Sequence, residues 1–423
     1  MDYEQRVPVL PERADIVVVG AGLTGLCTAL FLAHLPPAWK ILLLDTQSST
    51  DDTGAAEMDA VEGSFGPSHI ALSESSRRLF DRVGLWPSIA DRAAAITQIR
   101  VSDRGHVGHA VLAASEQGLD SFGHVVDATA LAEVLSDAVD KAPKVQRLHI
   151  EATIHLRPRA DAMALLVGDQ QTRAALVVLA NGQASPQARG LGITFQTKDY
   201  DRVAFTATLT LAEPHRGIAY ERFTRDGPIA LLPLPDRQGL PQASLVWSKA
   251  PDQAERLRTA SDIDCLNQLR EVFGDRAGPF AAIEHRRLTP LIKTVALEQV
   301  RSHLVLVGSA AHCLHPVAGQ GFNLSLRDIA GLAEVLAEGV IRDETPGMLS
   351  LLQRYQCMRE ADQARVMAFS DLLPSVFAST NPMVVSGRNL GLLGIDLVPE
   401  LGRGLARFGA GLLDGKGSRS ARA

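Results

Sequence analysis

The sequence predicts an α/β fold in which a Rossmann-type domain is interrupted by an antiparallel sheet and followed by a helical tail. Three observations lead to this prediction. A strand, a helix and another strand open the chain over residues 15–45. Apolar and polar residues then alternate through residues 200–250, as in an antiparallel sheet with one solvated face. A buried-strand pattern returns at residues 303–308, so we expect the first domain to be discontinuous.

The opening unit has the pattern of a right-handed βαβ motif. Residues 15–20, DIVVVG, form a β-branched run that ends in glycine, which is typical of a buried parallel strand. Apolar residues recur every three or four positions through residues 23–35, and Pro36 and Pro37 end this helix. Residues 40–45, KILLLD, give the second strand.

The remaining elements follow from the same periodicities. Residues 46–68 are small, acidic and polar, so we expect a surface loop there. Beyond it, the predicted elements are a helix at 73–86, two strands within 96–112, a helix at 127–142, a strand at 175–182 and a helix at 325–341.

These patterns divide the chain into four predicted regions. They are the first part of the nucleotide-binding domain at 1–184 with a helical insert at 70–95, an antiparallel-sheet substrate domain at 185–284, the second part of the nucleotide-binding domain at 285–360, and a helical C-terminal region at 361–423.

Composition limits the classes of function. The chain has 423 residues, of which 46% are hydrophobic and 21% charged, so it can bury a sizeable core. Its formal net charge of −6 argues against a nucleic-acid-binding protein. The four cysteines lack the spacing of disulfides or metal ligands, and neither a signal peptide nor an apolar run of spanning length is recognised. We therefore expect a cytoplasmic protein.

A glycine fingerprint follows the first strand. Gly20, Gly22 and Gly25 have the Gly-x-Gly-x-x-Gly spacing between a strand and a helix, and Asp45 lies about 20 residues further on. The glycines allow a tight turn, the approach of a pyrophosphate and close packing of helix on strand. The helix N-terminus favours the phosphates, and Asp45 is expected to bind a ribose. This motif predicts a dinucleotide but does not distinguish NAD from FAD.

A second glycine-rich segment lies late in the chain. Residues 306–328, LVGSAAHCLHPVAGQGFNLSLRD, begin as a buried strand and end as a helix. A plain turn does not need a proline and two glycines between these elements. We therefore expect a flat ligand to lie against this backbone.

This segment resembles the FAD-dependent aromatic-ring hydroxylases, the group A flavoprotein monooxygenases. The resemblance implies that Pro316 flanks the flavin ring and that Gly319, Gln320 and Gly321 present backbone N–H groups to the ring edge. It makes these four residues the expected catalytic positions. It also implies that FAD contacts the residues Gly308, Ser309, Pro316, Gly319, Gly321, Phe322 and Asn323, together with Asn181 after the strand at 175–182.

Within that family, the segments at 96–112, 315–334 and 387–411 are similar to the ubiquinone-biosynthesis hydroxylases, including the 2-octaprenyl-6-methoxyphenyl hydroxylases. The resemblance implies an NAD(P)H:oxygen monooxygenase that hydroxylates a prenylated phenol through a flavin 4a-hydroperoxide. NAD(P)H is expected as a transient co-substrate, beside molecular oxygen. The alternatives are a hydroxylase of another aromatic compound, or a catalytically weak scaffold flavoprotein of the ubiquinone-biosynthesis assembly.

The sequence departs from the family pattern at three places. Ser309 stands where the family usually has aspartate, and Asn181 also replaces an aspartate. Ser68 and His69 stand where many relatives have an arginine. A serine hydroxyl or an amide can still form hydrogen bonds to FAD, but without a charge. These departures are the support for the scaffold alternative.

Three further features leave their function open. His312 and His315 have a His-x-x-His spacing without a third ligand, so we do not predict a metal site. The segment 384–413 mixes apolar residues with arginines, which fits a core helix, a peripheral contact with the inner membrane or a contact with other biosynthetic proteins. An apolar substrate is expected to meet the sheet at 200–250, through residues including Phe205, Tyr220, Phe223 and Trp247.

Overall fold

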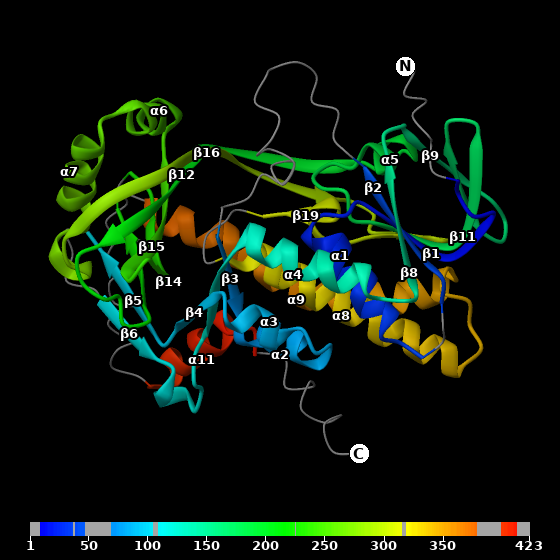
Figure 1. Ribbon diagram of the computed structural model, residues 1–423, viewed down its shortest axis with the longest axis horizontal. Coiled ribbons are helices and arrows are strands. Elements are labelled where there is room, and N and C mark those ends of the chain that lie inside the picture. The colour runs from blue at the N-terminus through cyan, green and yellow to red at the C-terminus, as the bar shows by residue number, and fades with distance from the viewer. Residues whose placement is uncertain are drawn as a thin grey trace.

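The computed structural model describes residues 9–36, 39–46, 69–104, 109–224, 226–314, 319–378 and 399–412. Within these residues, the strands form three sheets. Two of them lie towards opposite ends of an elongated molecule, and the long strands β12 (Phe195–Leu211) and β16 (Phe280–Ala296) run between these ends (Figure 1).

The first sheet is the nucleotide-binding sheet that the opening motif predicts. Its main path has the order β17-β18-β11-β1-β2-β8, and the strands from β18 to β8 are parallel. The strands of this sheet are β1 (Arg13–Val19), β2 (Ile41–Thr46), β8 (Val145–Ile150), β9 (Ile154–Pro158), β10 (Met163–Val167), β11 (Gln170–Leu179), β17 (Val300–Arg301) and β18 (Leu304–Leu306).

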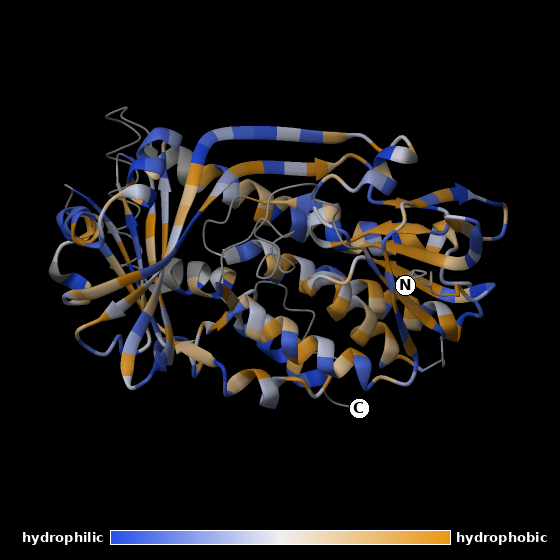
Figure 2. Cartoon of the chain, turned by 45° about the horizontal axis from the view of Figure 1, so that its top comes forward, coloured by the Kyte–Doolittle hydropathy of each residue, from blue (hydrophilic) through white to orange (hydrophobic). Residues whose placement is uncertain are grey.

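This sheet is hydrophobic on both faces, as Figure 2 shows for its strands. Ile16 and Val18 of β1 pack with helices α1 (Leu23–Ala33), α4 (Ala128–Asp140) and α8 (Gln320–Ile341). Val17 and Val19 face the opposite side, where residues of β10 and the segment after α5 (Pro186–Gly190) cover them. Burial on both faces explains the continuous apolar runs of these strands.

The second sheet has the order β19-β16-β12-β15-β14-β13-β5-β6. Its shorter strands are β5 (Gln98–Asp103), β6 (His109–Ala113), β13 (Ile218–Phe223), β14 (Ile229–Arg237), β15 (Leu240–Lys249) and β19 (His312–Cys313). Helices α6 (Pro251–Thr259) and α7 (Asp262–Phe273) pack against one face through Leu257, Leu266 and Leu269. The other face is turned towards the small third sheet.

The third sheet links the other two. It has the order β3-β7-β4, from β3 (His69–Ser73), β7 (Gly123–Asp127) and β4 (Ala93–Ile96). Helices α2 (Glu74–Arg82) and α3 (Trp86–Ala90) lie beside it. Ile96 and Val125 of this sheet share a core cluster with Ala219 and Leu234 of the second sheet.

Two helices close the described chain. Helix α9 (Leu349–Ala378) packs along α8, and α11 (Pro399–Gly409) lies close to the third sheet and β6 (Figure 1). Among the described residues, no helix is long and apolar enough to cross a membrane.

The predicted fold class is confirmed, but several elements differ from their predicted bounds. The helix expected at 73–86 is two helices, α2 and α3, because Gly84 between them adopts a left-handed φ of 70°. The strands β5 and β6 fall within 1–184, yet they belong to the second sheet, where β5 pairs parallel with β13. Helix α9 continues without a break across residue 360, the predicted boundary between the third and fourth regions. The four regions therefore remain predictions, and the loop expected at 46–68 lies almost wholly outside the described residues.

Candidate functional site at the carboxyl edge of the parallel sheet

The glycine fingerprint forms the tight turn between β1 and α1. Gly20 has a φ of 102°, and a Cβ placed there would lie 2.6 Å from the Cα of Asn181. A Cβ on Gly25 would overlap the carbonyl oxygen of Gly20. These two glycines are therefore required by the packing of the chain itself. Gly22, in contrast, has no atom of the described residues within 4 Å of the position of a Cβ, so this side of Gly22 is open among them.

The strand order brings four predicted cofactor-binding positions to the same edge. Because β18, β11, β1 and β2 are adjacent and parallel, Ser309, Asn181, Gly20 and Asp45 lie at or just beyond their carboxyl ends. Gly308 has a φ of 61°, and a Cβ there would lie 2.5 Å from Cγ2 of Thr24 on α1. The late glycine segment is thus packed directly against the fingerprint helix.

The polar groups at this edge differ in how freely they can meet a ligand. The carboxylate of Asp45 accepts a 2.8 Å hydrogen bond from Arg147, and its side chain is still 29% exposed. Ser309 is exposed. Asn181 donates through Nδ2 to Oε1 of Gln187 at 2.5 Å. Its buried Oδ1 has no hydrogen-bond partner among the described residues, and such an atom calls for a donor.

The second glycine segment opens helix α8. Gly319 is the N-cap residue in the left-handed conformation, with a φ of 59°, and no side chain among the residues that the structure describes caps this helix end. A Cβ on Gly319 would lie 3.2 Å from Cβ of Ala71 in β3, whereas no atom of the described residues lies within 4 Å of a Cβ on Gly321. Gln320 is buried and its Nε2 donates to the carbonyl of Gly409 at 3.4 Å. Pro316 lies outside the described residues.

The side chain of Asn323 is committed to the protein rather than to a ligand. Its Oδ1 accepts hydrogen bonds from the N–H of Ser73 at 2.8 Å and from Oγ of Ser76 at 2.7 Å. Its Nδ2 donates to the carbonyl oxygens of Ala71 and Gly319, both at 2.7 Å. The residue is 1% exposed. Its side chain therefore fixes the start of α8 against β3 and α2, a role that the sequence did not reveal.

The neighbouring Phe322 is partly buried against the hydrophobic core cluster that includes α1 and α8. Its ring therefore contributes to the packing of α8.

The two histidine features have structural partners. Nε2 of His69 lies 3.8 Å from the carboxylate of Asp127, and burial lowers the pKa of His69 although Asp127 opposes this shift. Nε2 of His312 lies 2.6 Å from the carboxylate of Asp328, which Arg359 also contacts at 2.7 Å. Burial disfavours the charge on Asp328, but His312 and Arg359 outweigh it and hold the pKa of Asp328 below its usual value. His315 and Ser68 lie outside the described residues.

Three of the four aromatic residues expected to line the substrate site lie on the face of the second sheet that α6 and α7 cover. Phe205, Tyr220 and Trp247 belong to the cluster that packs against α6 and α7. Of these four residues, only Phe223 points away from α6 and α7, because side chains alternate along β13. The alternating pattern predicted two faces correctly but did not show which one the helices cover.

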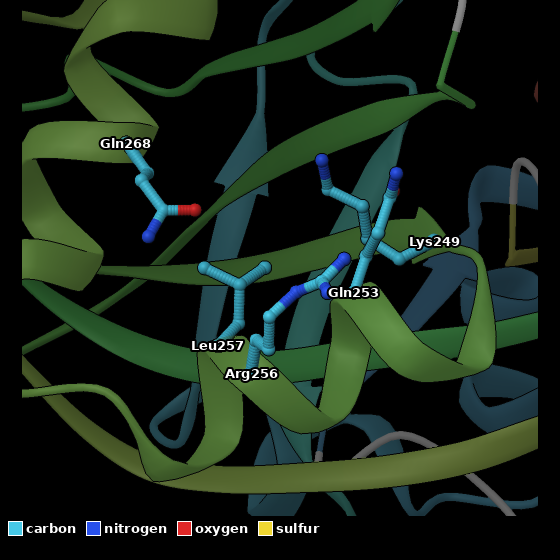
Figure 3. A pocket seen from close by; sticks show the side chains of 5 residues that line it. All are labelled: Lys249, Gln253, Arg256, Leu257 and Gln268. Carbon is cyan, nitrogen blue, oxygen red and sulfur yellow. The ribbon is translucent and has the colours of Figure 1, made fainter.

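A cavity of about 280 Å³ opens on this helix-covered side. Lys249, Gln253, Arg256, Leu257 and Gln268 line it, and they come from the end of β15, from α6 and from α7 (Figure 3). The ammonium group of Lys249 lies 4.0 Å from the centre of the Trp247 ring. This cavity therefore lies across the sheet from the glycine segments and plays no part in the site described above.

The residues at the carboxyl edge fit FAD. Helix α1 presents an uncapped N-terminus beside the open side of Gly22, which is the arrangement that a pyrophosphate needs. Asp45 offers a partly exposed carboxylate, and the buried Oδ1 of Asn181 needs a donor. The Gly319–Gly321 segment adds a second uncapped helix N-terminus. Fold and site together define a flavoprotein of the Rossmann type.

Comparison with known proteins agrees with this class. Residues 13–370 match the family model described as FAD binding domain, so the chain belongs to this family. The resemblance to FAD-dependent aromatic-ring hydroxylases is confirmed: the protein is an FAD-dependent monooxygenase.

Two curated relatives span nearly the whole chain. A ubiquinone hydroxylase, UbiL, of Rhodospirillum rubrum is 31% identical over 95% of this chain and 90% of the relative. The 3-demethoxyubiquinol 3-hydroxylase of Escherichia coli is 29% identical over 95% of this chain and 99% of the relative. Among solved structures, p-nitrophenol 4-monooxygenase PnpA of Pseudomonas putida has a TM-score of 0.70 at 18% identity and covers 95% of this chain and 99% of its own. This last similarity supports the fold.

Proposed function

We propose that this protein hydroxylates the ring of a prenylated phenol in ubiquinone biosynthesis, with NAD(P)H as electron donor and oxygen as oxidant. The observation that carries the proposal is the convergence of the two glycine segments. Gly308 packs on Thr24 of the fingerprint helix, and Gly319 packs on Ala71 of the sheet that joins the nucleotide and antiparallel parts. The names of the relatives from Rhodospirillum and Escherichia support the substrate class.

When bound, FAD supplies the hydride acceptor and the centre that activates oxygen. The chain has to hold the cofactor, orient the ring and exclude water. Gly20, Gly22 and the N-terminus of α1 would hold the pyrophosphate, Asp45 a ribose hydroxyl and Ser309 a ribityl hydroxyl. The backbone N–H groups at the start of α8 would face the flavin ring edge and favour negative charge there.

Ser309 and Asn181, which stand where the family has aspartates, can still bind FAD through hydrogen bonds. Ser309 is exposed at the strand end, where its hydroxyl can donate or accept a hydrogen bond. Asn181 keeps an acceptor oxygen in a buried position. A scaffold flavoprotein would also keep these groups, so the two functions differ only in turnover.

The membrane contact remains a prediction, since most of the segment 384–413 lies outside the described residues. In its described part, Ala406 and Ala410 of α11 are buried against the cluster that joins the second and third sheets. Phe408 packs against Phe369 of α9, with ring centres 4.4 Å apart. Core packing is therefore the role that these three residues support.

Anaerobic reduction of the bound flavin tests the proposal. NADH and NADPH would be mixed with the oxygen-free FAD-loaded protein, with and without a methoxyphenol that carries a short prenyl chain. We expect bleaching of the flavin absorbance with at least one nicotinamide, accelerated by the phenol. A protein that retains FAD but is bleached under neither condition would instead support the scaffold function.

A further inference from the structure

A row of side chains crosses the second sheet on the face turned away from α6 and α7. The pairings Val101↔Glu221, Glu221↔Ala230, Ala230↔Val246, Val246↔Thr206 and Thr206↔Arg287 make it continuous from β5 to β16. Residues that are directly opposite each other in paired strands point to the same face. The members of this row are Val101, Glu221, Ala230, Val246, Thr206 and Arg287.

The flanking residues of β13 establish which way the row points. Tyr220 belongs to the cluster under α6 and α7, and Nε of Arg222 donates to the carbonyl of Val272 on α7 at 2.9 Å. Side chains alternate along a strand, so Glu221 points to the opposite side. Ala219, two residues before Glu221, belongs instead to the cluster that includes the third sheet.

The same face leads to the second glycine segment. Ala71 of β3 packs against the cluster that contains Ala219. A Cβ placed on Gly319 would lie 3.2 Å from the methyl group of Ala71. At the other end of the row, the charge of Arg287 acts on His69 of β3. The third sheet therefore lies between this face of the second sheet and the start of α8, where the predicted ring-edge residues Gly319–Gly321 lie.

Glu221 differs from the other described carboxylates on this face. Its side chain is only partly exposed, and among the described residues no hydrogen bond or ion pair of its carboxyl group is found. Burial raises its pKa to about 7, so it can exchange a proton near neutral pH. Its neighbours in the row, Val101 and Ala230, carry no charge.

The other titratable or charged groups associated with this face have other surroundings. They are Asp103, which is buried one row further along β5, Glu284, which is 54% exposed beside Arg237 and His285, and, at the far end, Arg287 and His285, which both act on His69. Glu221 and Arg287 are four strand spacings apart, or roughly 19 Å. None of these groups neutralises Glu221.

We propose that Glu221 is the acid–base residue of the site and binds the ring hydroxyl of the phenolic substrate. This inference rests on the proposed function and names a residue for it. As oxygen transfer begins, the phenol O–H bond breaks and a carboxyl O–H bond forms on Glu221. The phenolate oxygen retains the electron pair and pushes it into the ring. The proton returns when the hydroxylated product leaves, so this step needs no oxidant or reductant of its own.

The test compares Glu221→Gln with Glu284→Gln in the FAD-loaded protein. Glutamine keeps the size and hydrogen-bonding capacity of the side chain but cannot take up a proton. With the prenylated methoxyphenol, we expect Glu221→Gln to lower the hydroxylation rate by about 10²–10⁴-fold, the usual contribution of a general base. We also expect it to remove the rise in kcat/KM around pH 7. The exposed Glu284→Gln is the matched control and should keep both the rate and the pH profile.

A binding measurement separates this inference from the proposed function. The probe is 4-nitrophenol, and its affinity is followed by absorbance at pH 6 and pH 9. At pH 9, the carboxylate of Glu221 in the wild-type protein would lie against the negatively charged 4-nitrophenolate. We therefore expect the affinity of the wild type to fall between pH 6 and pH 9 by about tenfold more than the affinity of Glu221→Gln, given the size of like-charge effects on ionisation. If the wild type and both variants fail to hydroxylate the prenylated methoxyphenol, the proposed substrate is refuted. The pH-dependent difference in 4-nitrophenol binding between the wild type and Glu221→Gln would still be expected, because it does not depend on turnover.

Either of two results would overturn the assignment of Glu221. One is a Glu221→Gln protein whose hydroxylation rate and pH profile stay within twofold of the wild type. The other is an identical pH dependence of 4-nitrophenol binding in the wild type and Glu221→Gln. Measured FAD content per chain shows in each case whether the variant still holds its cofactor.

Discussion

Glycines in this protein are required for two different physical reasons. Gly20, Gly25 and Gly308 leave no room for a side chain, because backbone or Thr24 atoms occupy that space. At Gly22 and Gly321, no atom from the described part of the chain lies within 4 Å of the position of a Cβ. A side chain at these two positions would not disturb the chain itself, so its effect reports on a ligand.

The substitution Gly321→Val uses this distinction. We expect the variant to fold with unchanged thermal stability, because valine fits the open space and has a better helix propensity than glycine. It should nevertheless lose FAD or reduce it slowly, since the side chain would meet the flavin. Gly190→Val, also in open space at the end of α5, is the matched control. Normal flavin reduction in Gly321→Val would place the ring elsewhere.

Glu221 should make the stability of the protein depend on pH. Its folded-state pKa of about 7 lies above its ordinary value of 4.5, so its contribution is fully present below pH 4.5 and is lost as the pH rises through 7. Glu221→Gln does not ionise. Urea unfolding at pH 5 and pH 8 should therefore show the variant gaining on the order of 2 kcal/mol relative to the wild type, a value reduced for partial exposure. An equal difference at both pH values would mean that the carboxyl group is solvated.

At the scale of elements, the start of α8 is held by hydrogen bonds rather than by packing alone. Asn323 bonds to Ser73, Ser76, Ala71 and Gly319, and so ties this helix to β3 and α2. A positioning role of this kind affects the cofactor through the placement of the loop.

We expect Asn323→Ala to lower the free energy of unfolding by about 2–4 kcal/mol, because several buried groups lose their partners. FAD affinity should fall together with stability. Thermal unfolding of the FAD-free and FAD-loaded protein measures both effects. Asn267→Ala, on helix α7, is an exposed comparison that should change neither. A variant with lower FAD affinity but unchanged stability would show that Asn323 contacts the cofactor directly.

A buried network of charges joins α8 to α9. Asp328 contacts His312 and Arg359, and Asp362 contacts both Arg359 and Arg327. Because these groups are paired inside the protein, removing one partner leaves an uncompensated charge.

The substitution Arg359→Leu should lower the free energy of unfolding at pH 7 by about 3–5 kcal/mol, the usual cost of breaking a buried ion pair. Arg365→Leu, whose side chain is 45% exposed, is the matched control on the same helix and should cost less than about 1 kcal/mol. Chemical denaturation compares the two variants. Equal small losses would mean that Asp328 takes up a proton when Arg359 is absent.

At the scale of the whole molecule, local patterns were predicted well and long-range contacts were not. The βαβ unit and the Gly20–Gly25 turn depend on neighbouring residues, so their spacing indicates them. Apart from Gly319, the partners of Asn323 lie about 250 residues away in the sequence, and no local pattern reveals them. The face that binds α6 and α7 is likewise fixed by packing. The sequence therefore does not distinguish Phe205 and Trp247, which face these helices, from Glu221, which lies on the opposite face.

The arrangement of the molecule explains why both sheets are needed. The parallel sheet presents the cofactor edge, and the antiparallel sheet presents the row that contains Glu221. The third sheet and the start of α8 lie between them. In the proposed reaction, an atom of oxygen passes to a phenol held on this face of the antiparallel sheet.

Isotope labelling tests this central claim most directly. The FAD-loaded protein would be incubated with NAD(P)H, a short-chain prenylated methoxyphenol and ¹⁸O₂, and the product examined by mass spectrometry. We expect one ¹⁸O atom in each hydroxylated product, with one NAD(P)H oxidised for each. Oxidation of NAD(P)H that yields only hydrogen peroxide, with no labelled phenol, would contradict the account.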